Sequence, residues 1–200
     1  MLGGFDYLCS MIRSVLLALF GMILSVSLYG QRYGGMVGLT LVTEKLPEGL
    51  EYAPLKFLGQ LEYPLRTKRF SGNEARWRVI VEPQFNWVFL PVREGLTGIE
   101  RQRAYEFGAN AGIRYRLPVA PSWSLHAQIS AGPHYISRAY VQQAGGYIFS
   151  DNFALGTEVT LRPGVDLLVQ GRFRHLSNAG LQNPNKGLDN FFLMLGLIVE

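Results

Sequence analysis

The chain has 200 residues, including 23 glycines, with 12% aromatic and 17% charged residues and a formal net charge of +4. This length fits one domain and is too short for two comfortable cores. Cys9 is the only cysteine, so intramolecular disulfides and multi-thiolate metal sites are excluded. The positive charge suits a phosphate-rich partner, but it is too common to identify one.

Residues 1–30 have the features of an export signal. Arg13 precedes an apolar run over residues 15–28, which ends among small or polar residues. Such a pattern is typical of a secretory signal peptide. We expect cleavage near Gly30, which leaves residues 31–200 as one outer-membrane domain. A retained membrane anchor is the alternative interpretation.

No second long apolar run follows, and the rest of the chain instead alternates between apolar and polar residues. Alternation over segments of this length is typical of transmembrane β-strands. Eight strands are predicted: Tyr33 to Thr43, Ala53 to Leu65, Arg76 to Phe89, Arg103 to Leu117, Trp123 to Ile136, Tyr147 to Leu161, Val165 to Asn178 and Asp189 to Glu200.

The two faces of these strands separate a membrane barrel from a soluble sandwich. The apolar face carries aromatic residues near both strand ends, as membrane girdles do, whereas the polar face carries charges of both signs. An eight-stranded barrel is too narrow for an open pore. We therefore predict an all-β, eight-stranded antiparallel transmembrane barrel with a packed polar interior, in which Glu62, Glu82, Glu106 and Glu158 face Arg78, Arg114, Arg172 and Arg174.

The connections alternate between short turns and longer loops, although residues 66–75 make a long connection on the short side. In outer-membrane barrels the longer loops face outside and the termini face the periplasm. The strand from Val165 to Asn178 therefore runs outward, and its last residues lie at the external end.

That external end combines a base, a hydroxyl nucleophile and a carboxylate. His175 and Ser177 are two residues apart on one strand and share a face. Asp189 follows in the returning strand, where a cross-strand neighbour can meet the imidazole. A serine hydroxyl becomes nucleophilic when a base takes its proton and a third group orients that base. The three residues therefore indicate an esterase site.

The alternation places all three residues on the lipid-facing side, since His175 and Ser177 share their face with Phe173 and Asp189 shares its face with Phe191. Polar groups on that side are costly, though less so near the membrane interface. An enzyme there would meet the ester bonds of lipids. A His-x-Ser pair alone is a weak signal, and Ser124 with His126 forms a similar pair that we assign to interior hydrogen bonding.

Asn178 and Asn185 have two interpretations, as turn residues of a tight hairpin or as donors to an oxyanion. His126 and His134 are interpreted as interior polar residues, because no further ligand has metal-site spacing beside them. Nucleophile-elbow, phosphate-loop and zinc-protease motifs are absent from the sequence. The basic residues lie mainly inside the inferred barrel, which argues against nucleic-acid binding.

The residues His175-Leu176-Ser177-Asn178-Ala179-Gly180, then Pro184-Asn185 and an acid at position 189, resemble the C-terminal signature of the outer-membrane lipid A 3-O-deacylases. The resemblance implies a barrel that removes an ester-linked 3-hydroxyacyl chain from lipid A without a metal or other cofactor. It also implies Ser177 as nucleophile, His175 as general base and Asp189 as the orienting acid, with Asn178 and Asn185 at the oxyanion hole. The chain departs from the family pattern at Asp189, where the family has glutamate, and at Glu200, where such barrels usually end in an aromatic residue.

The expected partner is therefore lipid A, or lipopolysaccharide, in the outer leaflet of the bacterial outer membrane. Pairing of two barrels as a homodimer stays open. Two alternatives remain beside the deacylase. One is a non-enzymatic barrel that serves as an adhesin or structural anchor, and the other is a phospholipase-type esterase, because fold class alone does not assign function.

Overall fold

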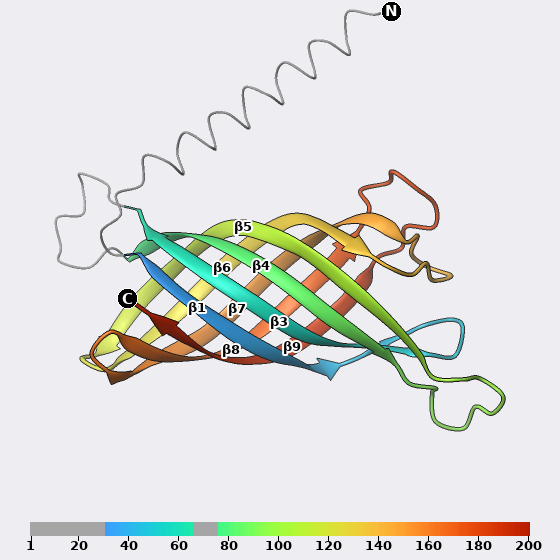
Figure 1. Ribbon diagram of the computed structural model, residues 1–200, viewed down its shortest axis with the longest axis horizontal. Coiled ribbons are helices and arrows are strands. Elements are labelled where there is room, and N and C mark those ends of the chain that lie inside the picture. The colour runs from blue at the N-terminus through green and yellow to red at the C-terminus, as the bar shows by residue number, and fades with distance from the viewer. Residues whose placement is uncertain (1–30, 66–75) are drawn as a thin grey trace, which may run out of the picture. The chain divides into compact units, whose positions relative to one another are not determined.

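The computed structural model describes residues 31–65 and 76–200, which form a closed antiparallel β-barrel (Figure 1). Its strands are β1 (Arg32–Val42), β2 (Glu44–Lys45), β3 (Glu51–Pro64), β4 (Trp77–Leu90), β5 (Gln102–Ala120), β6 (Trp123–Ile136), β7 (Gly146–Arg162), β8 (Val165–Ser177) and β9 (Leu188–Val199). The barrel closes because β1 pairs with both β3 and β9. The predicted barrel of eight long antiparallel strands is confirmed.

Two expectations fall outside the described residues, namely the signal peptide over residues 1–30 and the long connection over residues 66–75. Within residues 31–65 and 76–200, no helix has the length and apolar character needed to span a membrane.

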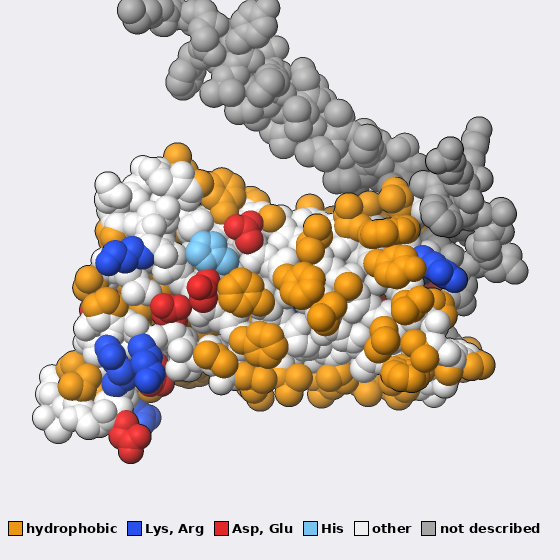
Figure 2. Space-filling view, turned by 180° about the vertical axis from the view of Figure 1, so that it is seen from behind, with side chains coloured by type: hydrophobic (Ala, Val, Ile, Leu, Met, Phe, Trp, Pro, Cys, Tyr) orange, Lys and Arg blue, Asp and Glu red, His pale blue; other side chains and the backbone are white. Residues whose placement is uncertain are grey.

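The two-residue alternation of the strands produces the two surfaces of the barrel. In β4, Trp77 and Trp87 point outward and are each 43% exposed, whereas Glu82 and Asn86 point inward and are fully buried. Apolar side chains cover much of the outer wall (Figure 2). Such a belt suits lipid, because the strand ladder satisfies the backbone polar groups within the wall.

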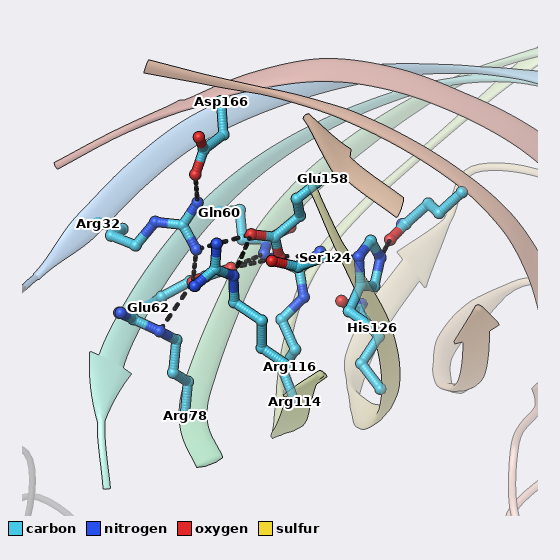
Figure 3. Close-up of polar contacts among 12 residues, drawn as sticks. Arg32, Gln60, Glu62, Arg78, Arg114, Arg116, Ser124, His126, Glu158 and Asp166 are labelled. Atoms are coloured by element: carbon cyan, nitrogen blue, oxygen red, sulfur yellow. Dashed lines mark hydrogen bonds and ion pairs between the residues drawn. The ribbon is translucent and has the colours of Figure 1, made fainter. Parts of the chain in front are cut away.

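Inside the barrel, ion pairs join strands that are far apart in sequence (Figure 3). Arg32 bonds to Glu62 at 3.2 Å and to Glu158 at 3.1 Å, and Arg114 bonds to Glu62. All of these side chains are almost fully buried. The predicted interior carboxylate–guanidinium network is confirmed, with Arg32 as a member that the sequence had not indicated.

Two further pairs lie nearer to the end of the barrel that holds His175. Glu82 accepts hydrogen bonds from Arg172 at 2.5 and 3.1 Å. Glu106 accepts one from Arg174 at 2.7 Å, and Arg174 also donates to Asn190 Oδ1 at 2.6 Å. Arg174 directly precedes His175 and points into the barrel. Its hydrogen bonds to Glu106 and Asn190 therefore hold the β8 backbone in place next to His175.

An apolar cluster fills the interior at the end of the barrel opposite the start of β1 and the end of β9. It includes Leu176 and Leu188, which are paired across β8 and β9. The other buried members of the cluster are Leu46, Leu50, Tyr52, Val88, Leu90, Ala104, Ile136, Tyr140 and Ile148. Leu176 and Leu188 point into this cluster, whereas the neighbouring residues of the site point outward. The packing of the two leucines therefore anchors the last hairpin to the barrel interior.

The structure differs from the predicted strands mainly near loops. Strand β2 lies within the segment expected to be a loop and pairs with the start of β3. Strand β5 continues to Ala120 across a bulge between Pro118 and Ala120, so the next turn is shorter than predicted. A two-residue strand and a bulge are both too short to leave a periodic signal in the sequence.

Candidate active site

The last two strands place His175 and Asp189 side by side on the outer wall. The two residues are direct partners in the β8–β9 register. His175 Nδ1 lies 2.7 Å from Asp189 Oδ1, and the side chains are 38% and 54% exposed. In Figure 2 a histidine lies beside acidic side chains, toward the end of the barrel where lysine and arginine side chains also gather, whereas the middle of the face is mainly apolar. An imidazole bound to a carboxylate through Nδ1 has its tautomer and orientation fixed, and its Nε2 is left for chemistry.

Ser177 occupies the same outward row of β8, two residues closer to the barrel end. It is half-buried and lies opposite Phe149 of β7. Within the described part of the chain, no hydrogen bond joins Ser177 to His175. The bond between a nucleophile and its base is often long in a site without substrate, so the arrangement remains compatible with the predicted pairing.

Asn178 and Asn185 shape the turn that follows Ser177. The Asn178 N–H donates to Asn185 Oδ1 at 2.8 Å, and Asn178 Nδ2 donates to the Gln182 carbonyl at 2.8 Å. Asn178 Oδ1 accepts the Gly180 N–H at 3.0 Å. These hydrogen bonds support the interpretation of Asn178 and Asn185 as turn residues. Their contribution to an oxyanion hole stays a prediction.

A second carboxylate, which the sequence interpretation missed, lies on the other side of His175. Asp151 of β7 is the direct register partner of His175 and is exposed on the outer wall. His175 is therefore flanked in the strand register by Asp151 on β7 and Asp189 on β9. The available signal was an acid within the outward row of β7, between Phe149 and Phe153, where lipid-facing charge is costly without a function.

The interior histidines are separate from this site. His126 Nε2 lies 3.0 Å from Gln170 Oε1, and His134 Nε2 lies 3.1 Å from Asn110 Oδ1. Both side chains are buried, as predicted for interior polar residues. Within residues 31–65 and 76–200, no group of three or more His, Cys, Asp or Glu residues is arranged to hold a metal ion.

A closed antiparallel barrel with an apolar outer belt and an ion-paired interior defines a β-barrel membrane protein. Comparison with known families is more specific. The family model described as lipid A 3-O-deacylase (PagL) matches residues 72–197, which is more than half of the chain. The chain belongs to the lipid A 3-O-deacylase (PagL) family and is a protein of the bacterial outer membrane.

Two solved structures share the fold. The outer membrane enzyme PagL is 15% identical over 82% of this chain and 97% of its own, with a TM-score of 0.54. Neisserial surface protein A is 11% identical over 85% of this chain and 96% of its own, with a TM-score of 0.53. No curated protein sequence matches the chain. At these identities the structural likeness supports the barrel fold alone.

Proposed function

We propose that this protein is a serine esterase of the outer membrane that removes an ester-linked 3-hydroxyacyl chain from lipid A. One observation carries the proposal: the 2.7 Å contact between His175 Nδ1 and Asp189 Oδ1 on the lipid-facing wall, in the same outward row as Ser177. Membership of the lipid A 3-O-deacylase family supports the substrate.

The proposed reaction uses Ser177 as the nucleophile. Its Oγ attacks the acyl carbonyl while His175 Nε2 takes the hydroxyl proton, and Asp189 stabilises the imidazolium that forms. His175 then gives the proton to the leaving sugar oxygen, so an acyl-serine and a free sugar hydroxyl result. Water attacks the acyl-serine with His175 again as base, which releases the 3-hydroxy fatty acid and restores Ser177.

The turn after Ser177 is the place for oxyanion stabilisation. Donors aimed at the developing negative charge contribute a large part of catalysis in acyl transfer. In the proposed site Asn178 and Asn185 belong to this turn, and the hydrogen bond of 2.8 Å between the Asn178 N–H and Asn185 Oδ1 keeps it compact. Asp189 would take the place of the family's glutamate, and its contact with His175 supports this role.

The outward position of the site supports a lipid substrate. His175 and Asp189 are exposed on the wall that carries the apolar belt, at the end of the barrel opposite the start of β1 and the end of β9. In an outer-membrane barrel this end faces outside, where the outer leaflet begins. An ester bond near the head group of a lipid in that leaflet would lie level with Ser177.

The test is mass spectrometry of lipid A from cells that produce the wild-type protein or the Ser177→Ala variant. Loss of one 3-hydroxyacyl mass in the wild type alone is the expected result. Unchanged lipid A in both strains, with both proteins folded in the outer membrane, would refute the deacylase. Release of fatty acid from phospholipids would then favour a phospholipase, and no release from any lipid would favour a non-enzymatic barrel.

A further inference from the structure

Gly187 lies against the His175 ring and is held through both of its backbone polar groups. A Cβ placed on Gly187 would stand 2.5 Å from Cε1 and 3.1 Å from Nε2 of His175. The Gly187 N–H donates to Gln143 Oε1 at 3.2 Å, and the Gly187 carbonyl accepts a hydrogen bond from Gln142 Nε2 at 3.4 Å. The position of Gly187 therefore limits where the imidazole can stand.

The two glutamines come from the loop between β6 and β7, which is docked on the last hairpin. The Ala144 N–H donates to the Pro184 carbonyl and the Lys186 N–H to the Gln142 carbonyl, both at 2.8 Å. Gln143 is fully buried and Gln142 is 9% exposed. Buried amides with satisfied partners hold a defined geometry, because breaking such a bond leaves a polar group without water.

A carboxylate from a third segment completes the arrangement. Glu44 of β2 accepts the Asp189 N–H through Oε2 at 2.9 Å and the Gln142 side-chain amide through Oε1 at 3.2 Å. Its two oxygens thus join the backbone of the orienting acid to the loop that holds Gly187. Glu44 is far from the last hairpin in sequence, and β2 brings it there.

The β8–β9 ladder alone does not fix this part of the hairpin. Its last register pair is Leu176 with Leu188, so Gly187 lies just beyond the ladder. We propose that Glu44, Gln142 and Gln143 are positioning residues for the hydrolysis, an inference that rests on the proposed esterase function. They hold Gly187 and the Asp189 backbone, and through these the His175 ring, in line with Ser177.

The proposal is tested by the rate at which a fluorophosphonate labels Ser177 and by kcat and KM on lipid A micelles, using the full-length protein in detergent. In labelling, Ser177 Oγ bonds to phosphorus, fluoride leaves and His175 takes the hydroxyl proton. Gln143→Leu removes the acceptor of the Gly187 N–H at similar volume, and Glu44→Ala removes the acceptor of the Asp189 N–H. Both should lower the labelling rate and kcat by about 10- to 100-fold, with KM within about twofold, because displacing a reacting group by about 1 Å has effects of this size.

Two matched variants separate positioning from general damage. Glu44→Gln keeps one oxygen that can accept the Asp189 N–H but loses the acceptor for Gln142 Nε2. It should therefore lose clearly less activity than Glu44→Ala, about threefold to tenfold, an order-of-magnitude expectation from the one bond retained. Gln182→Ala changes an exposed glutamine of the same hairpin and should match the wild type. If Gln143→Leu does not assemble, Gln142→Ala removes the donor to the Gly187 carbonyl and carries the same expectation.

The outcomes test the positioning role and the esterase function separately. Slow labelling in Gln143→Leu and Glu44→Ala, with partial recovery in Glu44→Gln, supports the positioning role. Wild-type rates in all folded variants overturn it and leave the esterase intact. Equal loss in Glu44→Ala and Glu44→Gln also overturns it, because the retained acceptor would then be irrelevant. A wild-type protein that neither labels nor cleaves lipid A overturns the esterase itself, and this inference with it.

Discussion

Substitution of Gly187 by alanine should disable the site while leaving the barrel folded. The new Cβ would stand 2.5 Å from His175 Cε1, about 1 Å short of an ordinary carbon–carbon contact. Gly187 has a φ of 83°, and an alanine in this region costs about 1–2 kcal/mol. The strain is small, so we attribute the main effect to displacement of the imidazole.

A shift of about 1 Å in a catalytic group lowers the rate by about 100-fold. We therefore expect Gly187→Ala to release 3-hydroxy fatty acid from lipid A about 100 times more slowly than the wild type. The assay is release over time by purified protein in detergent, beside the midpoint of urea unfolding. The unfolding free energy should fall by no more than about 2 kcal/mol.

The matched control is Gly95→Ala in the loop between β4 and β5. Gly95 has the same φ of 83°, and a Cβ there would meet nothing within 4 Å. This variant carries the backbone strain without the contact, so it should keep wild-type activity. Equal activity of the two variants would refute the reasoning, because displacement of His175 would then have no consequence.

Two further predictions concern the orienting acid and the interior. Asp189→Asn removes the charge that stabilises an imidazolium and should lower the rate of hydrolysis by about 10²- to 10⁴-fold. Asp189→Glu keeps the charge and should lose far less activity. Initial rates on lipid A distinguish the two variants, and an active Asp189→Asn would exclude Asp189 as the orienting acid. Glu82→Gln leaves the buried Arg172 guanidinium without its carboxylate partner and should lower the free energy of unfolding by about 3–5 kcal/mol, measured by urea unfolding in detergent. An unchanged midpoint would mean that other interior groups compensate for the lost charge.

The fold was predictable because every long strand must alternate between lipid and a packed interior. Trp77 and Glu82 could be assigned to opposite faces from spacing alone, and the structure places them there. The partners of each interior charge were less predictable. Arg32 pairs with Glu158 across 126 positions of sequence, and such a contact depends on the closure and register of the barrel, which leave no local signal.

The same division holds for the site. The contact between His175 and Asp189 follows from one hairpin, so spacing was enough to anticipate that the two could meet. Asp151 is placed beside His175 by the β7–β8 register, and the Glu44 carboxylate meets the Asp189 N–H from β2. The sequence also could not separate the two interpretations of Asn178, because its hydrogen bonds to Gln182 and Gly180 depend on the path of the turn.

The outward placement of His175 and Asp189 changes how an enzyme of this design would meet its substrate. A site on the outer wall is reached by lateral diffusion within one leaflet, in two dimensions, and not from bulk solution. Its rate would follow the mole fraction of substrate in the surrounding lipid or detergent. At a fixed total amount of lipid A, added inert detergent should therefore slow the reaction by spreading the substrate over more surface.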